Sequence, residues 1–307
     1  MSREIVGPYE ARDINARMDR LLNDLGNPEP PLRLELVREL LKLDLKYYSA
    51  NNPSYLQDIS HKIKVGAKQV ILRPGLILDV LKKVDLSAFY VPDTKRILID
   101  EDIPSPKHRW IEAHEIAHSV IDWHSGFMFG DNKLTLNPLC DETIEAEANY
   151  GGGRLLFLGD RFSEESRSEE LNFSNIRALA KQYGNTIQST LWRTVEEREP
   201  ESAVFGLVSI HPKHPDIGVK EYGKAPRFIR SDGFRRQFNN VSPDRVFSIL
   251  EQHARRNKGG PVVDTQEILA DCNGEQHVFK IESFSNTHAL LTYGVCCGKY
   301  SKLVSVA

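Results

Sequence analysis

The stretch SPKHRWIEAHEIAHSVIDW, residues 105–123, is the most informative part of the sequence. Ser105 is a preferred helix N-cap, and Pro106 suits the first helical position because its missing N–H leaves no hydrogen bond unmade there. Apolar side chains then recur every three or four residues, which predicts a single helix with one apolar face. Those side chains are Trp110, Ala113, Ala117, Val120 and Ile121.

The centre of this helix reads HEIAH, with His114 and His118 four residues apart. One helical turn brings both imidazoles to the same face, so two nitrogens can reach one metal ion at about 2.0–2.1 Å. Glu115 is displaced around the helix from that pair, where it can take a proton from a water on the metal. Chance alone gives such a pattern in roughly a few per cent of chains with ten histidines. Its place inside an amphipathic helix favours a metal site.

A tetrahedral site needs a third protein ligand, with the fourth position left to water. A second predicted helix, residues 141–158, offers Glu142, Glu145 and Glu147. At about 100° per residue, Glu145 shares the apolar face with Leu155, and Glu147 points to the opposite side. We therefore predict Glu145 as the third ligand and Glu147 as a solvated charge on the helix surface.

Two further side chains are candidates for contacts with the metal ligands. Asn149 lies one turn beyond Glu145 and can hydrogen-bond a ligand imidazole, although a surface amide is the alternative. His124 ends the metal helix, where it could donate to a tetrahedral intermediate or simply interact with the helix C-terminus. The run Gly151-Gly152-Gly153 inside the second helix predicts either a close helix crossing or a break.

Upstream of the metal helix, SAFYV and RILID are apolar, β-favouring runs separated by turn formers, which predicts a hairpin within residues 86–100. The second strand, Arg96 to Asp100, could present an open edge for a substrate peptide or lie inside a small sheet. Residues 32–48 have mainly helical spacing and predict one buried helix. The stretch 63–81 fits a strand and a helix equally well.

Taken over its whole length, the sequence predicts an α+β fold in four segments. The prolines of NPEPP interrupt the first helix, and the polar run 159–170 indicates a boundary. We expect an N-terminal arm at 1–30, a zinc metallopeptidase domain at 31–165, a helix-turn-helix-like connector at 166–200, and a mixed α+β C-terminal domain for sensing or partner binding at 201–307.

The composition restricts the class of partner. Of the 307 residues, 40% are hydrophobic and 27% charged, as in ordinary globular proteins. A formal net charge of -3 gives no overall positive field, so we expect no direct nucleic-acid binding. No apolar run reaches the roughly 18–20 residues of a membrane span, and the charged start differs from a secretory signal. The four cysteines lack zinc-ribbon spacing, and we expect reduced thiols in the cytoplasm.

These motifs resemble the ImmA/IrrE-type metallo-endopeptidases, a family of HExxH zinc peptidases of gluzincin-like type. The resemblance covers RILID, WIEAHEIAHSVIDWH and IEAEANYGGGRLLF, and more weakly NIRALAKQYGNTIQSTLWRTVEE, all within residues 86–197. The family's second motif looks like E-x-x-A-x-x-F-A, and its first Glu, a metal ligand, falls on Glu145. The sequence departs from that motif at Gly151-Gly152, where the family has F-A, and it lacks the proline after the following apolar pair.

The resemblance implies a zincin-like domain with a small sheet, and cleavage of a partner transcriptional repressor with a helix-turn-helix. We therefore predict a Zn²⁺-dependent endopeptidase in which His114, His118 and Glu145 hold the metal and Glu115 is the catalytic base. The alternative is a non-catalytic regulator, stabilised by a metal, that binds a repressor, a toxin or DNA. The ligand set suits manganese and cobalt as well as zinc.

Overall fold

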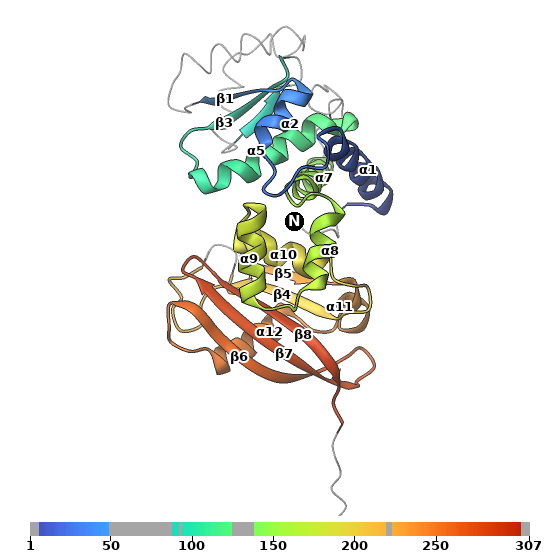
Figure 1. The fold of residues 1–307 in the computed structure, drawn as a ribbon. Coiled ribbons are helices and arrows are strands. Elements are labelled where there is room, and N and C mark those ends of the chain that lie inside the picture. The colour runs from blue at the N-terminus through green and yellow to red at the C-terminus, as the bar shows by residue number, and fades with distance from the viewer. Residues whose placement is uncertain (1–5, 49–87, 92–93, 125–137, 219–222, 302–307) are drawn as a thin grey trace, which may run out of the picture. The chain divides into compact units, whose positions relative to one another are not determined.

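The computed structural model describes residues 6–48, 88–91, 94–124, 138–218 and 223–301, which form a mixed α+β structure. The chain divides into two compact units, residues 1–161 and 162–307 (Figure 1). No helix in these ranges combines the length and apolar character needed to cross a lipid bilayer. The ambiguous stretch 63–81 lies outside the described residues.

Unit 1 combines a small sheet with helices on either side of it in the sequence. The central strand β3 pairs in parallel with β1 and antiparallel with β2, so the strand order is β1-β3-β2. The described elements are α1 (Pro8–Asp24), α2 (Leu34–Leu41), β1 (Asp44–Tyr48), β2 (Ala88–Val91), β3 (Arg96–Asp100), α5 (Ser105–Val120) and α7 (Pro138–Leu156).

The predicted hairpin is confirmed as β2 and β3, and of the two alternatives for its second strand, the interior position is the one observed. Strand β3 is the interior strand of the sheet, with Ile97, Leu98 and Ile99 all buried. Within the described residues, β2 is paired on one side only. Strand β1 forms the other edge of the described sheet, and β2 is an edge strand that packs against α5.

The helix predicted over residues 32–48 is also wrong in its second half. Helix α2 ends where Lys42 adopts a left-handed conformation with φ of 57°, and the chain then continues as β1. Strand β1 gains its hydrogen bonds from β3, which follows about fifty residues later in the chain. Local spacing contains no information about such a distant partner.

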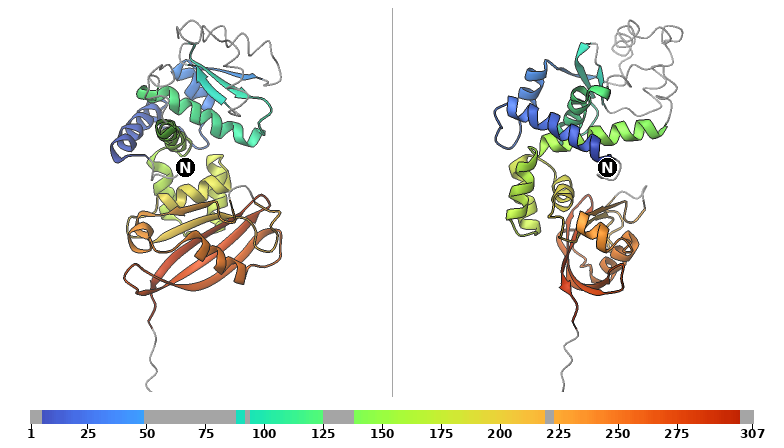
Figure 2. Two further views of the ribbon diagram at one scale, coloured as in Figure 1. Left: turned by 180° about the vertical axis from the view of Figure 1, so that it is seen from behind. Right: turned by 90° about the vertical axis from the view of Figure 1, so that its right-hand side faces the viewer.

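The N-terminal segment differs from the expected arm because it is part of unit 1. Helix α1 packs against α7, and its Ile14 and Met18 side chains are fully buried. Helix α7 in turn crosses α5, as both views of Figure 2 show. In unit 1 the sheet, α5, α7 and α1 are thus packed in succession, and α2 packs against α5.

Helices α5 and α7 cross closely at Gly152. A Cβ atom at this position would lie 3.1 Å from the backbone carbonyl carbon and oxygen of Ala113 and from the backbone nitrogen of His114. Helix α7 continues through all three glycines without a break, so the close-crossing alternative is the one observed. The absence of a side chain at Gly152 lets α7 approach the backbone that carries the first histidine.

Unit 2 contains an antiparallel sheet of five strands in the order β5-β4-β8-β7-β6. Helix α8 begins at the end of unit 1 and continues into unit 2. The described elements are α8 (Asp160–Ser168), α9 (Phe173–Tyr183), α10 (Ile187–Glu196), β4 (Val204–Ser209), β5 (Arg227–Arg230), α11 (Asp232–Gln237), α12 (Pro243–His253), β6 (Gly259–Ala270), β7 (Gln276–Asn286) and β8 (Leu290–Lys299).

The two faces of this sheet are covered by different helix pairs. Along β4, Phe205 and Leu207 pack in one apolar cluster with α11 and α12, and Val204 and Val208 pack in another with α9 and α10. The alternation follows from the two-residue period of a strand. The predicted connector, residues 166–200, therefore contributes α9 and α10 to the core of unit 2 instead of forming a separate segment.

The close crossing gives a stability prediction. Replacing Gly152 with Ala should lower the free energy of unfolding by about 1–3 kcal/mol, because the added methyl meets backbone atoms that cannot rotate away. The matched control is Gly153→Ala, whose Cβ would meet only the Trp110 ring at an ordinary 3.6 Å. That variant should be neutral or gain up to about 1 kcal/mol of helix propensity. Urea unfolding followed by circular dichroism compares them, and equal midpoints would contradict the prediction.

Candidate metal centre

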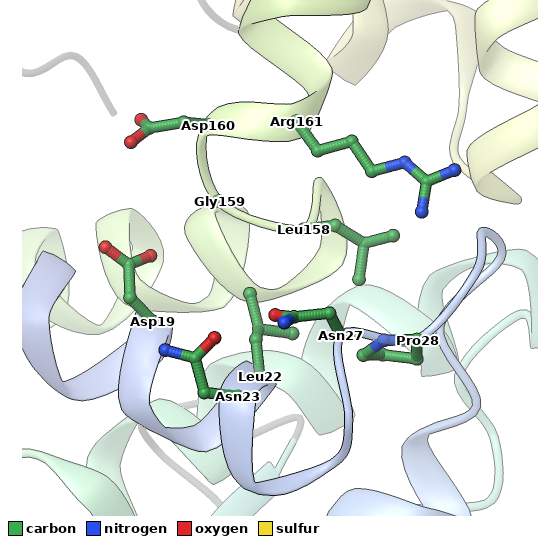
Figure 3. A pocket seen from close by; sticks show the side chains of 9 residues that line it. All are labelled: Asp19, Leu22, Asn23, Asn27, Pro28, Leu158, Gly159, Asp160 and Arg161. Carbon is green, nitrogen blue, oxygen red and sulfur yellow. The ribbon is translucent and has the colours of Figure 1, made fainter.

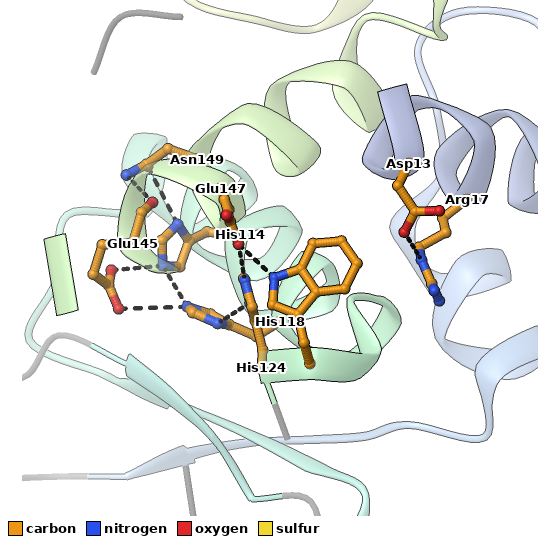
Figure 4. Close-up of polar contacts among 9 residues, drawn as sticks. Asp13, Arg17, His114, His118, His124, Glu145, Glu147 and Asn149 are labelled. Atoms are coloured by element: carbon orange, nitrogen blue, oxygen red, sulfur yellow. Dashed lines mark hydrogen bonds and ion pairs between the residues drawn. The ribbon is translucent and has the colours of Figure 1, made fainter. Parts of the chain in front are cut away.

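Helices α5 and α7 bring the three predicted ligands together. His114 Nε2 and His118 Nε2 are 3.1 Å apart, and the Glu145 carboxylate lies 3.1 Å from the first and 3.5 Å from the second (Figure 4). A tetrahedral ion with bonds of about 2.0–2.1 Å separates its ligand atoms by about 3.3–3.4 Å. The observed spacings therefore match three corners of a zinc tetrahedron, and the residues present fit the metal.

Asn149, which was predicted to contact a ligand imidazole, determines which nitrogen of His114 carries the proton. Asn149 Nδ2 donates to the Glu145 carbonyl oxygen at 2.7 Å, which orients the amide so that its Oδ1 faces His114 Nδ1 at 3.2 Å. An amide oxygen only accepts, so the neutral His114 ring carries its proton on Nδ1. Its Nε2 then presents a lone pair toward His118 and Glu145. Acceptors that converge in this way require a positive charge between them.

Without a metal, that charge is supplied by a proton. Burial opposes the charged form of His114, but the Glu145 carboxylate and the nearby Glu115 charge outweigh burial and raise the pKa of His114. The pKa of His118 is lowered by burial and by the adjacent His114. The shifts are opposite because two imidazoles 3.1 Å apart cannot both be charged. Burial raises the pKa of Glu145, but the interactions with His114 and His118 outweigh it and lower that pKa.

Glu115 lies beside the ligand cluster, where the motif predicts a catalytic base. Its side chain is 5% exposed, and burial raises its pKa to about 7, with the His114 charge opposing the shift. The backbone N–H of Tyr90 in β2 donates to this carboxylate. Burial, with the charges of Asp100 and Glu115 also contributing, raises the pKa of Tyr48 to about 12. The sequence pattern gave no sign of Tyr90 or Tyr48 near the site.

The prediction that Glu147 is a solvated surface charge is wrong. Its side chain is buried, 4% exposed, and accepts hydrogen bonds from Trp123 Nε1 and His124 Nε2. The Glu145 side chain is the more exposed of the two carboxylates, at 51%. The helical wheel separated the two faces of α7 correctly, but Trp123 and His124, on the turn that follows α5, cover the second face.

His124 lies behind His118, on the side away from Glu145. Its ring is fully buried, and its Nδ1 is 3.0 Å from His118 Nδ1 (Figure 4). The sequence allowed either a role at the site or an interaction with the helix C-terminus. The structure places His124 in direct contact with a predicted metal ligand.

A second group of three potential ligand atoms lies in unit 2, near the turn between β6 and β7. His277 Nε2 is 3.4 Å from Asp271 Oδ2, and Asp271 Oδ1 accepts the backbone N–H groups of Asn273 and Glu275. Glu275 also forms an ion pair with Lys299 at 2.6 Å. Because Asp271 closes the turn and Glu275 has its own counter-ion, these contacts explain the group as a stabilised turn.

A pocket of about 290 Å³ in unit 1 lies between the end of α1 and the start of α8 (Figure 3). Asp19 and Asp160 line it, and both accept hydrogen bonds from Arg154. Arg161, also in the lining, forms an ion pair with Glu29. Each charged side chain of the lining therefore has a partner, Arg154 for the two aspartates and Glu29 for Arg161, and the predicted site residues lie outside the pocket.

Comparison with known proteins bears on the fold. No protein-family model matches the sequence, and no curated protein matches it significantly. Among solved structures, the chain is similar to a Mycobacterium tuberculosis transcriptional regulator. The TM-score is 0.52, and the match covers 93% of this chain and 88% of that chain. At 13% sequence identity, this similarity concerns the fold alone.

The ligand geometry predicts the consequences of altering Glu145. Glu145→Gln keeps the shape of the side chain but removes its charge, and it should weaken zinc binding by more than about 100-fold, beyond the usual effect of losing an outer contact. Competition with a chromogenic zinc chelator measures the affinity. The control is Glu142→Gln, which alters an exposed carboxylate on the same helix and should leave the affinity unchanged. Wild-type affinity in Glu145→Gln would contradict the assignment.

Proposed function

We propose that the protein is a zinc-dependent endopeptidase of the ImmA/IrrE type. The observation that carries this proposal is the convergence of His114, His118 and Glu145 beside the buried carboxylate of Glu115. Two imidazoles and one carboxylate leave an open position on a tetrahedral ion, as in hydrolytic zinc sites. A structural zinc site usually has four protein ligands, and the described residues offer three here.

The residues of the chain can be given roles in peptide hydrolysis. Zinc supplies Lewis acidity, which polarises a carbonyl and lowers the pKa of water. Glu115 takes the proton from the attacking water and delivers it to the leaving amine. Burial assists the return of the proton, because it disfavours the charged carboxylate and raises the pKa of Glu115 to about 7 in the metal-free protein. A bound cation would offset part of this shift and favour the ionised form that accepts the proton. The Tyr90 N–H holds the carboxylate in place.

Strand β2 is suited to hold an extended substrate. It is an edge strand within the described part of the sheet, it packs against α5, and its Tyr90 backbone contacts Glu115. A peptide that adds to this edge by main-chain hydrogen bonds would pass next to the catalytic carboxylate. This mode of recognition suits unfolded or loop segments of a protein substrate.

For the substrate we propose a helix-turn-helix transcriptional repressor in the cytoplasm. This part of the proposal rests on the family resemblance, which implies cleavage of such a partner. The second candidate function is a non-catalytic regulator that uses its metal for stability and binds a repressor, a toxin or DNA. The observation in its favour is the fold similarity to a transcriptional regulator. The two functions differ in whether a peptide bond is cut.

Glu115→Gln separates these functions. The variant should bind zinc like the wild type, because Glu115 is not a ligand, but it should lose peptide-bond cleavage by at least about 100-fold, the usual contribution of a general base. Zinc-loaded wild type and variant are each incubated with a cell lysate, and new protein N-termini are identified by mass spectrometry. Fragments that form with the wild type alone support the endopeptidase.

Identical sets of N-termini for the two proteins would contradict the proposed activity. The non-catalytic alternative would gain support if the wild type then bound an intact repressor without fragmenting it. Glu142→Gln is the matched control, since it carries the same chemical change at an exposed position of α7 and should cleave like the wild type.

A further inference from the structure

A chain of buried polar contacts extends from His118 into the interior of unit 1. His118 Nδ1 is 3.0 Å from His124 Nδ1, and His124 Nε2 is 2.9 Å from Glu147 Oε2. Trp123 Nε1 donates to that same oxygen at 2.6 Å. The side chains of His118, His124 and Glu147 are 5%, 0% and 4% exposed, so water does not compete for these contacts.

The direction of each hydrogen bond follows from the outer end of the chain. The indole N–H of Trp123 can only donate, so Glu147 Oε2 is an acceptor. His124 therefore donates to it from Nε2, and its neutral ring has a lone pair on Nδ1. His118 must donate to that lone pair from its own Nδ1. The remaining nitrogen of His118, Nε2, is then unprotonated, and its lone pair faces His114 and Glu145.

We infer that Glu147, acting through His124, is a positioning residue that holds His118 in the tautomer able to bind zinc. The inference rests on the proposed zinc site. It adds two residues, His124 and Glu147, that hold a ligand in place and lie outside the ligand motif. Asn149 performs the same task for His114 by a direct contact. Both ligand imidazoles are therefore set with Nε2 toward the metal position before an ion arrives.

The arrangement of α7 explains why His124 is needed between Glu147 and His118. Glu145 and Glu147 are two residues apart on one helix, so their side chains leave it about 200° apart. Glu145 reaches the ligand cluster directly, and Glu147 points away from it. His124, on the turn that follows α5, bridges the gap between the Glu147 carboxylate and His118. One helix thereby supplies a ligand and the anchor of another ligand.

The series of contacts from His118 through His124 to Glu147, here called the relay, predicts how two substitutions change the zinc affinity. His124→Phe keeps a ring of similar size but removes the acceptor for His118, and it should raise the zinc dissociation constant 10–100-fold. Glu147→Gln keeps an acceptor oxygen and loses the charge, so it should have a smaller effect in the same direction. Chelator competition at one pH measures both, with Glu142→Gln as the control. Circular dichroism of the metal-free proteins confirms that each variant is folded.

A spectroscopic measurement on the wild type distinguishes this role from simple packing. Long-range ¹H–¹⁵N correlation of the zinc-loaded, ¹⁵N-histidine-labelled protein should show His118 protonated on Nδ1, with that proton protected from exchange. Either of two results would overturn the relay but leave the zinc site intact. One is a proton on His118 Nε2, and the other is wild-type zinc affinity in both His124→Phe and Glu147→Gln while the wild type binds zinc. A wild type that takes up no zinc would overturn both.

Discussion

The close approach of α5 and α7 is the contact on which the proposed metal centre depends. Gly152 lies against the backbone of Ala113 and His114, and one to two turns earlier on the same helix Glu145 and Asn149 contact the His114 ring. A larger residue at the crossing would separate the two helices. The ligands would then separate with them, because two come from α5 and one from α7. Helix packing and ligand geometry are therefore a single constraint.

The same crossing explains where the sequence departs from the family motif. A Cβ atom at Gly151 would lie 3.1–3.3 Å from Met18, Ala117 and Ile14, so α1 occupies the space that a phenylalanine would need. The triple glycine, which weakens a helix in isolation, is thus compensated by burial of α1 on one side and α5 on the other. The N-terminal helix takes the place of a side chain in packing the metal-motif helix.

The sequence predicted those features that depend on short spacings. The histidine pair, the hairpin and the choice of Glu145 follow from helix and strand periods within one or two elements. Strand β1 and the packing of α1 could not be predicted, because each depends on a partner far along the chain. The error at Glu147 has the same origin. A helical wheel shows which residues share a face, but the cover on that face comes from Trp123 and His124, in a different element.

Electrostatics connects the ligand cluster to the Glu115 carboxylate, the proposed catalytic base. Glu115, Glu145 and two imidazole lone pairs form a largely buried, electron-rich group that has no lysine or arginine among its described contacts. In the metal-free protein, burial is the main cause of the raised pKa of Glu115, and the carboxylates of Glu145 and Glu115 raise the pKa of His114 against the effect of burial. A divalent cation at the centre favours the charged form of a nearby carboxyl and so lowers its pKa. Binding of the metal would therefore release protons and favour the ionised form of Glu115, which is the form that the proposed hydrolysis needs.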